Sequence, residues 1–164
     1  MTDPAPKPRP ELPTDAAALE PMGAAYDEAL EAGLEELALL DSAAAAAPAR
    51  ASYEAHSRLL RDWNAAINLT AVRDPADAAR RHVCDSLSAA TVLAPRLHGE
   101  VSLLDIGSGG GYPGLPLAAA LPLAGVALLD SVMKKARFLA VAGDAVTAAL
   151  SDGGVAPPVI AAVP

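Results

Sequence analysis

A cluster of glycines in the middle of the chain has the composition of a ligand-binding loop. Residues 105–111 (DIGSGGG) follow a short apolar run and precede a compact apolar segment over 113–121. Glycine adopts backbone angles closed to other residues and lets a ligand approach the main chain closely. The amides of the loop, and of the helix behind it, can then donate hydrogen bonds to a polar or anionic group. The pattern predicts a binding loop between a strand and a helix.

The spacing within this loop fits three interpretations. Gly109-x-Gly111-x-x-Gly114 matches the dinucleotide-binding fingerprint, whereas Asp105-x-Gly107-x-Gly109-x-Gly111 matches the loop of S-adenosylmethionine-dependent methyltransferases. The third interpretation is a glycine turn with a purely structural role. Asp105 favours S-adenosylmethionine, because a carboxylate there can lie near the ammonium of the methionine part and would repel a pyrophosphate. A phosphate-binding P-loop is excluded, because its Gly-Lys-Ser/Thr ending is absent.

A second carboxylate, Asp130, ends the apolar run over 125–130. Carboxylates at the carboxyl ends of parallel strands face the cofactor crevice, where they accept hydrogen bonds from ribose hydroxyls. This role suits either cofactor. The alternative is that Asp130 and Ser131 cap the helix that follows.

The elements that must position these residues are read from hydrophobic periodicity. Helical spacing predicts amphipathic helices over about 26–40 and 53–67, and a third that begins at Asp74-Pro75 and ends before Pro95. Apolar runs over 101–106, 125–130 and 159–163 alternate with helical segments over 113–121 and 132–150. This alternation is typical of an α/β fold with a parallel sheet. The sequence stops after the third strand, so we expect a truncated sheet.

Composition divides the chain into three parts. Residues 1–48 form a Pro- and Ala-rich acidic extension, expected to be largely disordered; 49–99 form a helical N-terminal subdomain; and 100–164 form the N-terminal half of the sheet domain. The net charge of −8 belongs entirely to the extension. Because the remainder is neutral, the overall acidity does not exclude a nucleic-acid partner.

Composition also argues against several other classes of protein. A single cysteine and three histidines without ligand spacing predict no disulfide framework and no metal site. The chain has no apolar run of about 20 residues and no secretory signal, so no membrane contact and a cytoplasmic location are expected.

Four blocks in one order resemble a known enzyme family: residues 61–75 (RDWNAAINLTAVRDP), 81–87 (RHVCDSL), 104–117 (LDIGSGGGYPGLPL) and 128–139 (LLDSVMKKARFL). They are similar to the small-subunit (16S) rRNA guanine-N7 methyltransferase G family, also called glucose-inhibited division protein B. The resemblance implies a Rossmann-like S-adenosylmethionine-dependent methyltransferase sheet with a helical N-terminal subdomain. Its substrate would be N7 of a guanine in 16S rRNA, free or in the small ribosomal subunit.

The resemblance and the loop pattern together name the candidate cofactor-binding residues: Asp105, Gly107, Gly109, Gly111, Tyr112 and Asp130. Gly107 and Tyr112 would touch the cofactor by matching position, with Asp130 on the ribose side. The sequence departs from the family at Cys84, where an aliphatic residue is usual. It also ends before the later acidic pair and arginine that contact the cofactor in the family.

Two groups of basic residues are candidate RNA contacts. The first comprises Arg73, Arg80, Arg81 and His82, and the second comprises Lys134, Lys135 and Arg137. The alternative for both is a solvated helix face, with the arginines paired to Asp74, Asp77 or Asp85 and His82 satisfied by Asp85. Trp63 is expected in the core rather than as a platform for base stacking.

The expected reaction requires no catalytic acid, base or nucleophile, because N7 of guanine carries a free lone pair. No catalytic residue is therefore assigned. One alternative function is an inactive, truncated fragment that retains cofactor or RNA binding. A nicotinamide-dependent oxidoreductase half-domain is the other. A monomer is expected.

Overall fold

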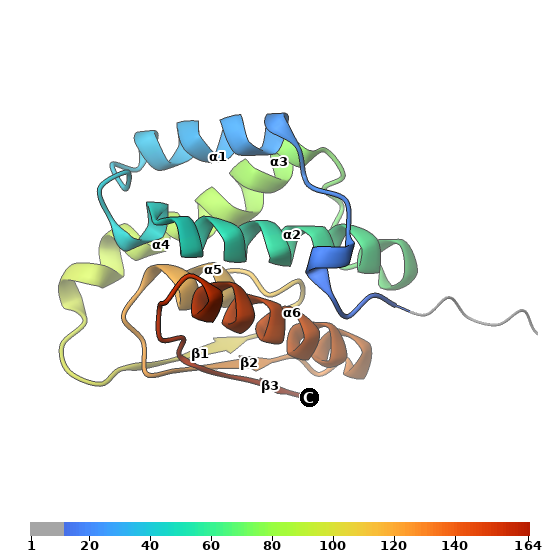
Figure 1. The fold of residues 1–164 in the computed structure, drawn as a ribbon. Coiled ribbons are helices and arrows are strands. Elements are labelled where there is room, and N and C mark those ends of the chain that lie inside the picture. The colour runs from blue at the N-terminus through green and yellow to red at the C-terminus, as the bar shows by residue number, and fades with distance from the viewer. Residues whose placement is uncertain (1–11) are drawn as a thin grey trace, which may run out of the picture.

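The computed structural model describes residues 12–164 as layers of helices stacked on a small parallel sheet (Figure 1). The first part holds the 3-10 turn η1 (Ala16–Ala18), helix α1 (Ala24–Glu36), the 3-10 turn η2 (Ala43–Ala45), helix α2 (Ala47–Ile67), helix α3 (Pro75–Ala78), the π-helical segment η3 (Ala79–Cys84), helix α4 (Asp85–Leu93) and the 3-10 turn η4 (Ala94–Arg96). The second holds strand β1 (Ser102–Ile106), helix α5 (Gly114–Ala120), strand β2 (Gly125–Leu129), helix α6 (Met133–Asp152) and strand β3 (Val159–Val163).

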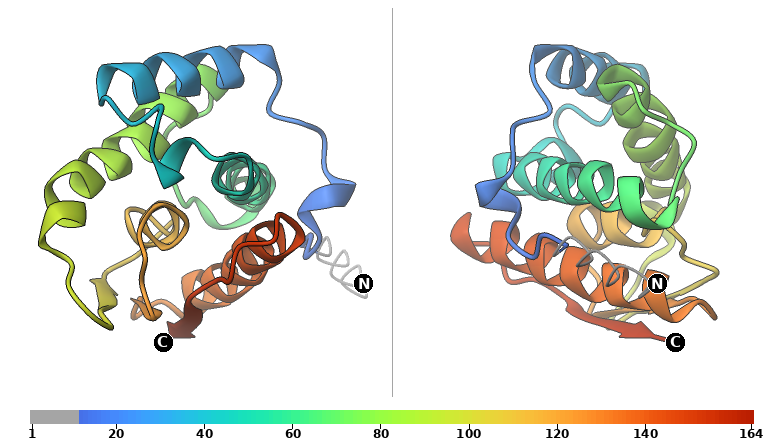
Figure 2. Two further views of the ribbon diagram at one scale, coloured as in Figure 1. Left: turned by 60° about the vertical axis from the view of Figure 1, so that its left-hand side comes forward. Right: turned by 90° about the vertical axis from the view of Figure 1, so that its right-hand side faces the viewer.

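Helix α2 runs through the middle of the molecule (Figure 2). Its apolar stripe, which includes Tyr53, Leu60 and Trp63, is buried as the periodicity predicts. The helix ends where Asn68 adopts a left-handed backbone conformation. The Asn64 side chain then bonds both backbone groups of Thr70, at 2.9 Å each, and so holds the chain after the helix end.

The third expected helix is present as the continuous helical run α3–η3–α4. Asp74 caps it by accepting a hydrogen bond from the Asp77 amide at 3.0 Å, with Pro75 at the first helical position. The sequence does not predict that the central six residues, η3, are π-helical. Single π-helical turns inside helices occur frequently at functional sites.

The sheet has the expected three strands, all parallel, in the order β1-β2-β3. Helices α5 and α6 pack on one face, and α2 lies over them (Figure 1). On the other face Leu104, Ile106 and Val159 are 58%, 73% and 75% exposed. The α/β Rossmann-like fold class is therefore confirmed.

Residues 12–48 differ from the largely disordered extension that composition predicts. Tyr26 and Leu34 of α1 are fully buried within the helical layer, which consists of α1, α2 and the run α3–η3–α4. The proline-rich segment before α1 is anchored to α2, because the Trp63 indole donates a hydrogen bond to the Pro13 carbonyl at 2.7 Å. Proline lacks an amide donor but keeps its carbonyl acceptor, so side chains of α2 can anchor such a segment. Residues 1–11 lie outside the described residues, and the three-part division of the chain remains a prediction.

Two kinds of feature are absent from residues 12–164. No helix there is long and apolar enough to span a bilayer. No group of three or more His, Cys, Asp or Glu side chains in the same range is placed to hold a metal ion.

Helix α1 approaches η3 closely at Gly33, which gives a test of its packing. A Cβ at Gly33 would overlap the Cys84 sulfur and lie 3.0 Å from the Cys84 Cβ. We expect Gly33→Ala to lower the free energy of unfolding by about 1–2 kcal/mol, because overpacking outweighs the gain in helix propensity. Urea unfolding measures this change. Gly33→Ala should cost less stability when Cys84→Ala removes the sulfur than when Cys84 is present. An equal cost of Gly33→Ala with and without Cys84→Ala would contradict the packing.

Candidate functional site

The glycine loop leaves β1 at the carboxyl edge of the sheet and is bonded to the neighbouring strand. The amides of Gly107 and Ser108 donate to the Leu129 carbonyl at 2.8 and 3.0 Å. The Gly111 amide then donates to the Ser108 carbonyl at 2.7 Å and closes a turn. The predicted strand–loop–helix arrangement is therefore present.

The loop has an open side and a closely packed side. Gly107 and Gly109 adopt φ angles of +79° and +54°, and a Cβ on either would meet no heavy atom closer than 3.8 Å. At Gly111, in contrast, a Cβ would lie 2.7 Å from Leu115 Cδ1 and 3.0 Å from His56 Nε2. The first two glycines thus leave room for a ligand, whereas the third permits the close approach of loop and helices.

Asp105 lies on the helix side of the loop. Its Oδ2 accepts a hydrogen bond from the amide of Gly114, the first residue of α5, at 3.1 Å. Burial raises the pKa of this carboxyl, and the bond from Gly114 lowers it by a smaller amount. The carboxylate therefore ties the end of β1 to the start of α5.

Asp130 is 6% exposed and lies on the other side of the loop. Its Oδ2 accepts from the Gly109 amide at 3.0 Å, and its Oδ1 accepts from the Val132 amide at 2.9 Å. Val132 is the N-cap residue of α6 and the helix has no side-chain cap, so this bond fixes the turn before α6 and does not cap the helix. The Lys135 ammonium lies 3.9 Å from Oδ2.

The ring of Tyr112 is turned into the helical layer. It stacks on His82 of η3, with ring centroids 4.7 Å apart and planes inclined by 21°. It also stacks on His56 of α2, at 4.4 Å and 25°. Burial raises the pKa of the Tyr112 phenol well above its usual value. Tyr112 therefore joins the loop to α2 and η3.

The first basic group includes His82, which belongs to this stack. Arg73, Arg80 and Arg81 are exposed and form no ion pair with any residue in 12–164. The His82 Nε2 lies 2.9 Å from the Thr70 hydroxyl oxygen, so Thr70 rather than Asp85 is its hydrogen-bond partner. Burial lowers the pKa of the His82 imidazole. At neutral pH the three arginines therefore carry the positive charge of this group.

The second basic group occupies the first turns of α6. Lys134 and Arg137 are exposed, and Lys135 lies beside Asp130. Each basic group has one member next to the loop: Lys135 lies beside Asp130, which bonds Gly109, and His82 stacks on Tyr112. These two residues, His82 and Lys135, are 53 positions apart in the sequence.

His56 is a site residue that the sequence patterns did not predict. It is 1% exposed, and its Nε2 lies 2.7 Å from the Gly110 carbonyl oxygen. Its only sequence signal is its position between Tyr53 and Leu60 on the buried stripe of α2. A polar residue on an apolar stripe must find a partner in the interior.

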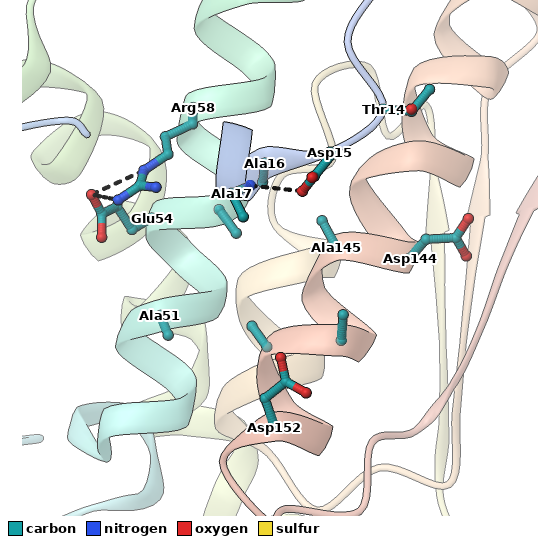
Figure 3. A pocket seen from close by; sticks show the side chains of 13 residues that line it. Thr14, Asp15, Ala16, Ala17, Ala51, Glu54, Arg58, Asp144, Ala145 and Asp152 are labelled. Atoms are coloured by element: carbon teal, nitrogen blue, oxygen red, sulfur yellow. Dashed lines mark hydrogen bonds and ion pairs between the residues drawn. The ribbon is translucent and has the colours of Figure 1, made fainter. Parts of the chain in front are cut away.

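A groove of about 520 Å³ lies elsewhere, between α2 and α6 beneath η1 (Figure 3). Alanines line much of it, and Asp15, Asp144 and Asp152 lie around them. No residue of the glycine loop lines this groove. Its acidic residues would repel phosphate groups, so it does not suit RNA.

Comparisons with known proteins identify a family. The family model for rRNA small subunit methyltransferase G matches residues 50–149, more than half of the chain. This range includes most of α2, the helical run α3–η3–α4, the glycine loop and most of α6.

Curated relatives carry the same name, "Ribosomal RNA small subunit methyltransferase G". The protein from Anaeromyxobacter dehalogenans (strain 2CP-1) is 44% identical over 119 residues, which are 72% of this chain and 51% of the relative. The protein from Alkalilimnicola ehrlichii is 49% identical over 110 residues, 67% of this chain and 46% of the relative. This chain thus spans about half the length of the curated relatives it matches. It belongs to the rRNA small subunit methyltransferase G family.

Proposed function

We propose that this chain binds S-adenosylmethionine at the glycine loop and serves the methylation of N7 of a guanine in 16S rRNA. The observation that carries the proposal is the loop itself, with an open side at Gly107 and Gly109 and a carboxylate on each flank. The family gives the reaction class, since its curated members are named as rRNA methyltransferases.

The two carboxylates favour S-adenosylmethionine over a dinucleotide. Asp130 occupies the Gly109 amide, and Asp105 occupies the Gly114 amide at the start of α5. A pyrophosphate needs such amides as donors and would be repelled by the carboxylates. S-adenosylmethionine carries a sulfonium and an ammonium, so negative charge beside the loop attracts it. The nicotinamide alternative is therefore disfavoured.

The residues present fit such a cofactor. Gly107, Gly109 and Gly111 would bring the main chain close to it, with Asp105 near the ammonium and Tyr112 at the loop's end. Asp130 would accept hydrogen bonds from the ribose hydroxyls. Each of its carboxylate oxygens already accepts one hydrogen bond from a backbone amide and has a second lone pair free for this.

The chemistry places few demands on acid–base groups. The bound cofactor would supply an electrophilic methyl on its sulfonium, and the C–S bond would break as the bond to N7 forms. Guanine N7 has a lone pair and no proton to lose, so no residue needs to act as a general base. The contribution of this chain is alignment of the two reactants, which is worth about 7–11 kcal/mol in favourable cases.

The two basic groups are the proposed RNA contacts: Arg73, Arg80, Arg81 and His82, and Lys134, Lys135 and Arg137. The side chains of Arg73, Arg80, Arg81, Lys134 and Arg137 are exposed, and phosphates of a bound 16S rRNA or small-subunit particle would lie against them. Such contacts supply affinity and orientation but not base specificity. We further propose a cytoplasmic monomer.

A second candidate is binding of the cofactor or of RNA without turnover. Incubation with labelled S-adenosylmethionine and unmethylated 16S rRNA distinguishes the two: label transfer to RNA supports the enzyme, whereas cofactor binding without transfer supports the binding protein.

Removing the charge of Asp130 tests the cofactor site. We expect Asp130→Asn to weaken binding of S-adenosylmethionine at least tenfold by calorimetric titration, because the amide cannot accept through both of its terminal atoms. Asp144→Asn, the same change at an exposed position of α6, is the matched control and should bind as the parent does. A parent chain that binds NADH and not S-adenosylmethionine would overturn the proposal.

Removing charge from η3 tests the proposed RNA interface. We expect the double change Arg80→Ala and Arg81→Ala to weaken binding to a 16S rRNA fragment. The slope of log K against log salt concentration should become shallower by roughly 0.7 for each phosphate that the variant no longer neutralises, the value for single strands. Arg96→Ala, an exposed position of the 3-10 turn η4 that follows α4, is the control. An unchanged slope in the double variant would assign these arginines to a solvated helix face.

A further inference from the structure

The buried histidine of α2 contacts the main chain of the glycine loop. His56 Nε2 lies 2.7 Å from the Gly110 carbonyl oxygen, although the two residues are 54 positions apart. We propose that His56 is a positioning residue of the cofactor loop, which it holds by donating a hydrogen bond from Nε2 to Gly110. The inference rests on the proposed function only in taking this loop as the cofactor site.

The bond fixes which ring nitrogen carries the proton. A carbonyl oxygen can only accept, so Nε2 must be the donor. Burial lowers the pKa of the His56 imidazole to about 4, with the Gly110 contact opposing that shift. At neutral pH the ring is therefore uncharged, with its proton on Nε2. An uncharged donor suits this place, because an imidazolium behind the loop would repel a sulfonium cofactor.

The orientation of the imidazole is itself constrained. One neighbour is the Tyr112 ring, stacked at 4.4 Å, and another is Phe138 of α6, whose ring centroid lies 6.1 Å away. These rings come from the loop and from α6, so the imidazole of α2 is packed against two other parts of the fold. Such packing restricts a side chain to one rotamer, as a positioning role requires.

The consequence for the loop follows from peptide planarity. The Gly110 carbonyl and the Gly111 amide belong to one rigid peptide unit. Its oxygen is bonded to His56, and its N–H donates to the Ser108 carbonyl at 2.7 Å. The plane is thus held from both edges. Since glycines rotate freely about φ and ψ, holding this plane limits the orientations open to Gly109, whose amide bonds Asp130.

Three substitutions separate hydrogen bonding from packing. His56→Phe keeps an aromatic ring and removes the donor. His56→Gln places an amide nitrogen near the position of Nε2, whereas the shorter Asn in His56→Asn cannot reach Gly110. Tyr53→Phe is the matched control, because its buried hydroxyl, on the same helix, has no hydrogen-bond partner within residues 12–164.

The measurements are calorimetric binding of S-adenosylmethionine, hydrogen exchange at the Gly111 amide and the thermal midpoint. We expect His56→Phe and His56→Asn to weaken binding at least fivefold and to speed Gly111 exchange by a similar factor. His56→Gln and Tyr53→Phe should stay within twofold of the parent in both binding affinity and the rate of Gly111 exchange. If His56→Gln binds the cofactor better than His56→Asn while the two variants have the same thermal midpoint, the effect is one of positioning and not of stability.

The contrary results are distinct. Unchanged binding and exchange in His56→Phe would overturn the inference, as would a Gln variant that loses as much as the Asn variant. If His56→Phe does not fold, the comparison of Gln with Asn decides. If the parent chain fails to bind S-adenosylmethionine, the proposed function fails, and Gly111 exchange in the same variants still tests the role of His56.

Discussion

The arrangement of the site depends on two carboxylates, each of which accepts a hydrogen bond from a glycine amide. Asp105 at the end of β1 bonds Gly114, and Asp130 after β2 bonds Gly109. A shielded carboxylate is costly unless its lone pairs are satisfied, and charge-assisted bonds to amides are among the stronger ones available. The pair therefore ties the loop to two strands and to the start of α5. In the proposed function, the same charges select a cationic cofactor.

The glycine loop packs against the helical layer, through α2 and η3. Tyr112 projects from the loop into this layer, where it stacks on His56 of α2 and His82 of η3. The close approach at Gly111 leaves no room for a side chain between the loop and α2. A change in the helical layer would therefore be transmitted to the loop through direct contacts. The family match covers most of α2, the run α3–η3–α4 and the loop.

Much of the fold was accessible from local patterns, because the relevant forces act over a few residues. The buried stripe of α2 and the cap at Asp74 were predicted, as were the three strands. Helix α1 was also predicted, but the ordering of residues 12–48 around it was not, because the Pro13 carbonyl is held by Trp63 of α2 and α1 packs against η3. The π-helical geometry of η3 also had no signal in residue spacing.

The sequence by itself determined most of the elements and the place of the glycine loop between a strand and a helix, since hydrophobic period, proline, glycine and capping residues act locally. Only the tertiary structure decided the partners of the site residues. The Tyr112 ring points inward and stacks on His82. His82 hydrogen-bonds Thr70 rather than Asp85, and His56 hydrogen-bonds the Gly110 carbonyl. These pairings join residues 12 to 54 positions apart. They follow from how whole helices pack on the sheet, which no local spacing encodes.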